Sequence, residues 1–191
     1  VAPESRLLVK SCEQHLSLSG ALLDMVCGNS VANILLQHNR NYIQACTSLQ
    51  RLSVPLNTTT KMTLVGSMGD DFIVAHGGVD MLRGRGGRDY LEGGDGADRV
   101  KGGRKSDVLD GGNGADTLTG GRGQDRFILS AGEDVITDFD PQFDHVAIAP
   151  NVNVSFNDID GGMQILGDGI QTTLEGVSQE DFVARMPIAY M

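Results

Sequence analysis

The sequence predicts an all-β solenoid, and three observations point to it. Residues 66–137 divide into eight tandem nonapeptides, with aspartate at position six and an apolar residue at position eight of every unit. Glycine, which accepts backbone conformations that other residues avoid, is concentrated in the same segment. The flanks contain short stretches of alternating apolar and polar residues, which are typical of β-strands. Self-similarity at a fixed short period indicates a repeat architecture.

Each nonapeptide contains a turn followed by a very short strand. The first six residues, rich in glycine and aspartate, form the turn, and the last three form the strand, with position eight pointing inward. One unit cannot bury an apolar side chain alone, so stacked copies are needed to build a continuous apolar column. The column residues are Ile73, Leu82, Leu91, Val100, Leu109, Leu118, Phe127 and Ile136.

The units resemble the RTX calcium-binding repeat, GGxGxDxUx with U apolar. The resemblance implies a right-handed parallel β-roll, in which two nonapeptides make one turn of the coil and the loops alternate between two edges. The first edge then carries Asp71, Asp89, Asp107 and Asp125, and the second carries Asp80, Asp98, Asp116 and Asp134.

The same resemblance implies that Ca²⁺ lies between consecutive loops of one edge. Aspartate side chains and loop carbonyls would hold it, and three gaps per edge give up to about six ions. Besides the aspartates, the loop residues implied in binding are Gly84, Arg85, Gly86, Gly93, Asp95, Gly102, Arg104, Gly111, Asn113, Gly120 and Arg122.

Calcium explains why a chain would stack its aspartates. Like-charged carboxylates one strand spacing apart repel each other, and a divalent cation with oxygen ligands reverses the sign of that interaction. The free energy of ion binding then contributes to folding. Two alternatives are a metal-free structural roll and a disordered glycine-rich linker, although a linker would not keep an apolar residue at position eight.

Two repeats depart from the pattern within their turns. Repeat two has Ala75 and His76 where glycines are usual, and repeat five has Lys105 at position four. We expect a positive φ at Lys105, which disfavours a residue with a side chain. Its ammonium group is also expected to weaken a nearby ion site.

Residues 137–148 resemble the segment that closes many RTX rolls. We expect Phe139 and Phe143 to plug the open end of the apolar column, and Asp138 and Asp144 either to bind a last ion or to cap turns. Farther on, residues 152–158, 163–167 and 170–176 are predicted to be strands. A short helix is predicted from Ser178, with Asp181 at its third position in a capping-box-like start.

Residues 1–65 are predicted to form an N-terminal β-rich cap. Residues 15–20, the stretches on either side of a polar turn at 38–41, and two stretches within 50–66 have strand-like patterns. The alternative for residues 19–37 is an amphipathic helix broken at Gly28. The sequence thus divides into a cap (1–65), the repeats (66–137) and a C-terminal β cap with a short helix (138–191).

Composition narrows the classes of function. The net charge of −10 argues against a nucleic-acid partner and suits a cation binder, and no apolar run is long enough to span a membrane. Cys12, Cys27 and Cys46 form an odd set, which leaves either buried thiols or one disulfide and a spare thiol. A first residue other than Met suggests a processed product or a fragment.

The sequence favours a non-enzymatic calcium-binding module of a secreted or cell-surface protein, with a structural or adhesive role. No HExxH or GxSxG motif is present, and the four histidines form no catalytic or metal-binding pattern. The alternatives are a subunit of an extracellular filament or surface layer, and the C-terminal module of a secreted hydrolase. Cations at variable repeat positions form either a solvated face or a surface for an anionic polysaccharide; they are Arg83, Arg85, Arg88, Arg99, Lys101, Arg104, Arg122 and Arg126.

Overall fold

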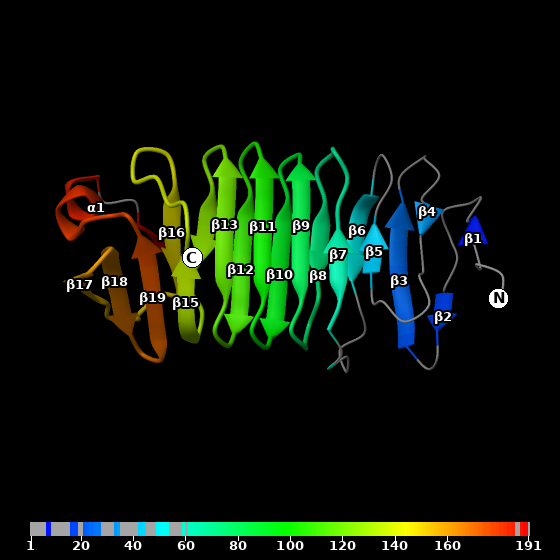
Figure 1. Cartoon of the computed structure of the whole chain (residues 1–191), viewed down its shortest axis with the longest axis horizontal. Coiled ribbons are helices and arrows are strands. Elements are labelled where there is room, and N and C mark those ends of the chain that lie inside the picture. The colour runs from blue at the N-terminus through cyan, green and yellow to red at the C-terminus, as the bar shows by residue number, and fades with distance from the viewer. Residues whose placement is uncertain are drawn as a thin grey trace.

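The chain forms two nine-stranded sheets that run along an elongated body (Figure 1). The computed structural model describes residues 59 and 61–185, and outside them the backbone of several strands. One sheet has the order β2-β3-β6-β8-β10-β12-β14-β16-β20, and the other β17-β18-β19-β15-β13-β11-β9-β7-β5. The strands of the repeats are β8 (Phe72–Val74), β9 (Met81–Gly86), β10 (Tyr90–Asp95), β11 (Arg99–Arg104), β12 (Val108–Asn113), β13 (Thr117–Arg122), β14 (Arg126–Ile128) and β15 (Gly132–Ile136).

Within the repeats every strand pairs in parallel with the strand 18 residues away. Leu91 lies opposite Ile73 and Leu109, and Val100 lies opposite Leu82 and Leu118. Since 18 residues are two nonapeptides, successive repeats fall alternately in the two sheets. The predicted parallel β-roll is therefore confirmed, with odd-numbered loops on the first edge and even-numbered loops on the second.

The side chains at position eight form the core. All eight of the residues predicted for the apolar column are at most 1% exposed. Leu64 and Val146, from strands outside the nonapeptides, extend the column at its two ends. A three-residue strand buries little by itself, so the stacked column supplies the apolar burial that holds the coils together.

Parallel pairing also extends upstream of the first nonapeptide. β5 (Tyr42–Gln44) pairs with β7 (Thr63–Val65), which pairs with β9, and β6 (Leu49–Ser53) pairs with β8. The remaining N-terminal strands are β1 (Leu7–Leu8), β2 (Leu16–Leu18), β3 (Ala21–Cys27) and β4 (Asn33–Ile34). Strands therefore replace the alternative helix where residues 21–27 and 33–34 are described.

The strands predicted on either side of the polar turn at 38–41 are present, and they belong to different sheets. β4 pairs in antiparallel fashion with β1, whereas β5 joins the parallel roll, so these two strands do not pair with each other. A strand-like pattern does not specify which strand will be its partner, and here β5 pairs with β7 at the end of the roll. The turn itself and the side chains of Cys12, Cys27 and Cys46 lie outside the described residues.

The C-terminal end of the column is closed by a cluster of phenylalanines. Phe127 contacts Phe139, Phe139 contacts Phe182, and Phe182 contacts Phe156, with ring centroids 5.5–5.9 Å apart. Phe139 is buried as expected, but Phe143 is 49% exposed, so its predicted role in the plug is wrong. Phe182 from helix α1 (Gln179–Arg185) fills that place, and it is fully buried.

The rest of the C-terminal cap follows the predicted order. β16 (His145–Ile148) continues the first sheet, while β17 (Ser155–Ile159), β18 (Gly162–Gly167) and β19 (Ile170–Glu175) extend the second; β20 (Ile188–Tyr190) pairs with β16. At the start of α1, the N–H of Asp181 donates to the Ser178 hydroxyl, and that hydroxyl donates to the Asp181 carboxylate. This is the predicted cap. In the part of the chain that the structure describes, no helix has the length and apolar character of a membrane span.

Candidate metal centre

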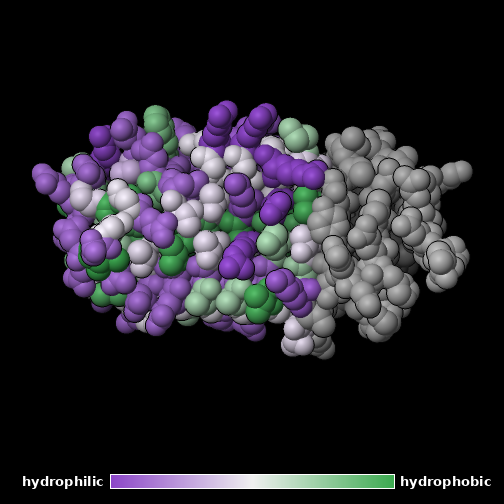
Figure 2. Space-filling view, viewed as in Figure 1, coloured by the Kyte–Doolittle hydropathy of each residue, from purple (hydrophilic) through white to green (hydrophobic). Residues whose placement is uncertain are grey.

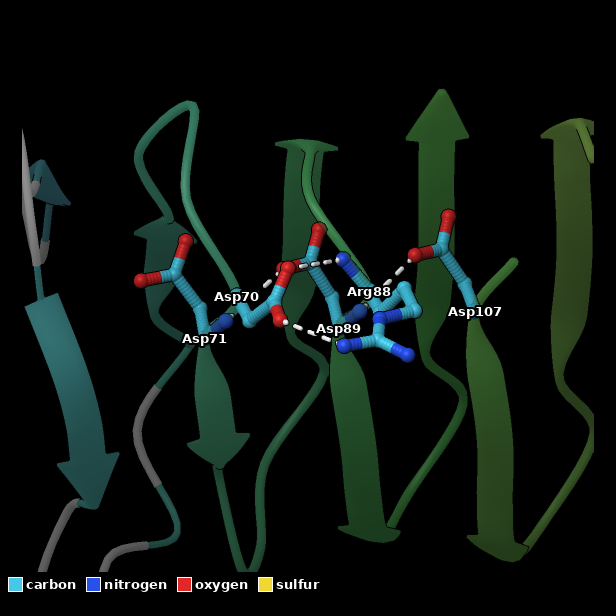
Figure 3. A network of polar contacts seen from close by, with 5 residues as sticks. All are labelled: Asp70, Asp71, Arg88, Asp89 and Asp107. Carbon is cyan, nitrogen blue, oxygen red and sulfur yellow. Dashed lines mark hydrogen bonds and ion pairs between the residues drawn. The ribbon is translucent and has the colours of Figure 1, made fainter. Parts of the chain in front are cut away.

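The aspartates at position six form one buried column along each edge. All eight are at most 4% exposed. In each edge, the backbone N–H of one aspartate donates to Oδ1 of the aspartate one coil later, as Asp89 does to Asp107 at 2.9 Å and Asp98 does to Asp116 at 2.7 Å. Figure 3 shows the row formed by Asp71, Asp89 and Asp107 on the first edge. Except for Asp71, each of these aspartate side chains therefore links two coils through one of its two oxygens.

The second carboxylate oxygen has no hydrogen-bond donor in most of these aspartates. The unpartnered buried atoms are Oδ2 of Asp80, Asp89, Asp98, Asp107, Asp116 and Asp125. A buried carboxylate oxygen without a donor is energetically costly, and native structures rarely tolerate it. Three such atoms lie on each edge, and a cation is a ligand that would satisfy them.

A backbone carbonyl lies beside each of several unpartnered oxygens. A Cβ atom added to Gly84 would contact Asp89 Oδ2 and would lie 2.8 Å from the carbonyl oxygen of Gly102. In the same way, a Cβ atom added to Gly102 would contact Asp107 Oδ2 and the carbonyl oxygen of Gly120. The glycine at position one leaves a cradle there, with a carboxylate oxygen and a carbonyl oxygen on its walls. Oxygen donors of these two kinds are those that Ca²⁺ prefers.

Among the described residues, no group of three His, Cys, Asp or Glu side chains is placed to hold a metal ion. Each loop contributes one position-six carboxylate, and the next carboxylate of the edge lies one coil away. A cation in these loops would therefore take its remaining ligands from backbone carbonyls. The donor set fits a hard cation with many oxygen ligands and does not fit Zn²⁺, which prefers nitrogen and sulfur.

Burial makes the charged form of these aspartates unfavourable without a cation. Burial is the largest cause that raises the pKa of Asp89 and Asp125 to about 6, of Asp98 and Asp134 to about 7, and of Asp107 to about 8. Backbone N–H donors oppose this effect, and the neighbouring carboxylates of the same column add to it in each of these pKa values. Without a cation, burial therefore makes the charged form of these aspartates less favourable than it is in an exposed carboxylate.

The structure separates the other predicted site residues into two groups. The position-one residues Gly84, Gly93, Gly102, Gly111 and Gly120 are buried, and each faces the Oδ2 atom of the aspartate in its own repeat. Gly86 lies beside the Met68 side chain. The side chains of the remaining predicted residues are exposed; they are Arg85, Asp95, Arg104, Asn113 and Arg122.

The residues that replace glycine in the repeat pattern have the positive φ that glycine has at the same positions. Lys105 has φ 72°, as predicted, and His76 and Arg85, both at position two, have φ 69° and 81°. Side chains rarely adopt this left-handed region, which costs about 1–2 kcal/mol per residue. The stacked coils therefore impose the loop conformation on residues that do not favour it.

Ser67 is a site residue that the repeat pattern did not identify. Its backbone N–H donates to Asp71 Oδ2 at 2.6 Å, and its hydroxyl lies 3.1–3.2 Å from both oxygens of that carboxylate. Asp71 is thus satisfied within its own loop. A serine at position two, where glycine is usual, was the available signal in the sequence.

Asp138 and Asp144 both accept hydrogen bonds from backbone N–H groups in the segment that closes the roll. Asp138 accepts hydrogen bonds from the N–H groups of Gly120 and Gly121, both at 2.9 Å. Asp144 accepts from Asp125 N–H through Oδ1 and from Asp140 N–H through Oδ2. Asp144 thus continues the first-edge column, one residue out of the 18-residue register.

Comparison with known proteins identifies the repeats. Residues 63–91, 92–127 and 101–136 match the family described as RTX calcium-binding nonapeptide repeat (4 copies). The comparison with curated proteins gave no significant match.

Two solved structures are similar to the chain. One is a subunit of the mannuronan C5-epimerase from Azotobacter vinelandii, with 25% identity, coverage of 71% of this chain and 81% of that one, and a TM-score of 0.41. The other is an extracellular lipase from Serratia marcescens, with 15% identity, coverage of 77% of this chain and 45% of that one, and a TM-score of 0.37.

Proposed function

Since residues 63–136 carry RTX calcium-binding nonapeptide repeats, we propose that this chain is a non-enzymatic module whose folding depends on calcium. The observation that carries the proposal is the set of six buried Oδ2 atoms without a donor, three on each edge. They also support a count of up to about six ions. The aspartates and position-one glycines of both edges would hold the ions, with loop carbonyls as the further ligands.

Bound calcium supplies positive charge to the buried carboxylate columns. The chain's own residues do the rest: the aspartates link consecutive coils, the glycines leave room for the ion, and the position-eight column buries apolar surface. Because the ion binds the stacked coils and not the extended chain, its binding free energy adds to the stability of the roll.

We assign the module to the outside of the cell, on a secreted or cell-surface protein. Extracellular calcium-binding modules work at dissociation constants of about 10⁻⁴–10⁻³ M, well above the calcium concentration inside cells. A chain of this kind stays unfolded before export and folds where calcium is abundant. We retain the division into a cap at 1–65, repeats at 66–137 and a cap at 138–191.

Calcium titration of the chelator-treated full chain tests the proposal. We expect far-UV circular dichroism to change from a largely unfolded spectrum to a β-sheet spectrum, with a decrease in hydrodynamic radius, and EGTA to reverse both. Magnesium at the same concentration is the control, because its small size and strict octahedral geometry suit these loops poorly. A spectrum and radius unaffected by EGTA would overturn the proposal.

A cationic surface supports a second role, the binding of an anionic polysaccharide. Strands β9, β11 and β13 contain no Asp or Glu, and hydrophilic residues cover much of the middle of the roll in Figure 2. The exposed cations of these strands are Arg83, Arg85, Arg99, Lys101, Arg104 and Arg122. Arg83 lies opposite Lys101, and Arg104 lies opposite Arg122, on neighbouring strands. Like charges in such positions destabilise a sheet, and a bound polyanion would compensate for them.

Dextran sulfate tests this second role, with uncharged dextran as the control polymer. We expect the calcium-loaded chain to bind only the sulfated polymer, with an affinity that falls as salt rises. The triple variant Arg83→Gln, Lys101→Gln, Arg104→Gln is expected to lose this binding, while Arg185→Gln in α1 retains it. Equal binding by the triple variant and the unmodified chain would contradict the role.

A further inference from the structure

The two edges of the roll differ sharply in the charge of their loops. The loops of the first edge, 66–71, 84–89, 102–107 and 120–125, contain Arg85, Arg88, Arg104, Lys105 and Arg122. The loops of the second edge, 75–80, 93–98, 111–116 and 129–134, contain no Lys or Arg, and they add Asp95 and Glu133 to their position-six aspartates. Each edge nevertheless has three buried Oδ2 atoms without a hydrogen-bond donor.

On the first edge, the N-terminal end already has internal partners for its carboxylates. Ser67 donates to both oxygens of Asp71. The Arg88 guanidinium lies 3.4 Å from Asp70 Oδ2, and the Arg88 N–H donates to Asp70 Oδ1 at 2.7 Å. Figure 3 shows Asp70 and Arg88 beside the row of buried aspartates. The chain's own donors and cations thus compete there with an added ion.

Lys105 places a further cation in the middle of the first edge. It occupies position four, and its backbone carbonyl approaches Gly123 one coil later, so its backbone lies within the stack of loops while its side chain is exposed. Its positive charge acts on the carboxylates of Asp70 and Asp89, which lie on the same edge. A positive charge beside these loops lowers their affinity for an added cation by charge repulsion.

The second edge has the opposite environment. Position four is glycine in all four loops, at Gly78, Gly96, Gly114 and Gly132. Asn113 Nδ2 donates to Asp95 Oδ1 at 2.8 Å, which links consecutive loops while leaving the Asp95 charge in place. More negative charge around the same oxygen donors favours a divalent cation.

We propose that the second edge binds calcium more tightly than the first, so that ions fill the second edge before the first. This inference rests on the proposed calcium-dependent function. The second edge then directs the initial stacking of coils, and the first edge completes the roll at a higher calcium concentration. The affinities of the two sets of sites differ by about tenfold or more, as expected from the difference in charge between the loops that surround the same kinds of ligand.

Calorimetric calcium titration of the chelator-treated full chain tests the order, with far-UV circular dichroism recorded alongside. We expect a tight and a weak phase of uptake. Asp98→Asn on the second edge and Asp107→Asn on the first form a matched pair, because both side chains are 1% exposed and both accept from the N–H one coil earlier. Asp98→Asn should remove sites from the tight phase, and Asp107→Asn from the weak phase.

A charge variant keeps the test decisive if an aspartate variant fails to fold. Lys105→Gly restores the usual glycine, and we expect it to tighten the weak phase several-fold without altering the tight phase. Arg185→Gln, a charge change of the same size in α1, should alter neither phase. One phase of equal sites, depletion of the same phase by both aspartate variants, or an unchanged weak phase in Lys105→Gly would each overturn the order of filling. Absence of any calcium uptake would instead overturn the proposed function.

Discussion

The backbone N–H of Asp80 donates a hydrogen bond to Oδ1 of Asp98, 2.7 Å away and one coil later in the chain. The carboxylate thus joins two coils through one oxygen and leaves the other without a donor. These two oxygens have separable roles. Oδ1 serves the stacking of the coils, and in the proposed function Oδ2 binds the ion.

Replacing Asp98 separates the two roles. In saturating calcium, which keeps the roll folded, we expect Asp98→Ala to be less stable than Asp98→Asn by about 1–3 kcal/mol, because alanine leaves the buried Asp80 N–H without an acceptor. Asparagine keeps an acceptor at Oδ1 and loses the charge. Chemical denaturation of both variants measures the difference, and equal stabilities would show that the hydrogen bond contributes nothing.

The metal-free roll should become less stable as pH rises. Burial raises the pKa of Asp98 to about 7 and of Asp107 to about 8, above the ordinary value of 3.8. Between these limits the folded chain binds more protons than the unfolded chain, so the free energy of unfolding falls with pH. This stabilisation is fully present below about pH 4 and is lost as pH rises to about 8.

Far-UV circular dichroism of the calcium-free chain at pH 5 and pH 8 checks this dependence. The fraction of folded chain should be larger at pH 5, and saturating calcium should restore the β-sheet spectrum at pH 8, since the ion replaces the protons. A calcium-free folded fraction that increases from pH 5 to pH 8 would contradict the burial effect.

A methyl group at position one should damage the site. In Gly102→Ala, the new Cβ would meet Asp107 Oδ2 and the backbone carbonyl of Gly120. We expect a loss of about 1–3 kcal/mol in unfolding free energy and weaker calcium binding. Gly69→Ala is the matched control, because the Cβ atom that it adds would have the Ser67 hydroxyl, 3.7 Å away, as its nearest neighbour. Thermal denaturation with and without calcium compares the two variants, and the prediction fails if they behave alike.

The phenylalanine plug gives a test of the C-terminal cap. Phe182→Ala should cost about 3–5 kcal/mol, because the ring is fully buried against Phe139 and Phe156. Phe143→Ala, at a ring that is 49% exposed, should change stability by less than about 0.5 kcal/mol. Denaturation of both variants in saturating calcium isolates the cap from the ion sites. Similar losses in the two variants would restore Phe143 to the plug.

The repeats could be predicted because their sequence period and their structural period coincide. Asp107 is at position six and Leu109 at position eight of their repeat, and the same positions meet one another every 18 residues in the structure. The pattern alone therefore places Asp107 in the loop column and Leu109 in the core. Lys105 was likewise predictable, since the stack imposes a positive φ at position four whatever residue stands there.

Outside residues 66–137, where the nonapeptide period ends, the sequence predicts the packing of individual side chains and strands less well. Phe139 and Phe143 are both aromatic and close in sequence, and only the return of helix α1 decides that Phe182 fills the space beside Phe139. The partner of β5 depends on the open edge of the roll rather than on its own residues. Ser67 meets Asp71 through a loop geometry that the repeat pattern does not specify. Long-range packing decides such features.

The 18-residue register also limits how this chain can evolve. Duplication or loss of two nonapeptides preserves the sheet and the edge of every later residue. Duplication of a single nonapeptide would move each later loop across the molecule and mix cationic loops such as 102–107 with acidic ones such as 93–98. The protein can therefore lengthen or shorten by pairs of repeats and still keep its cationic loops on one edge and its acidic loops on the other.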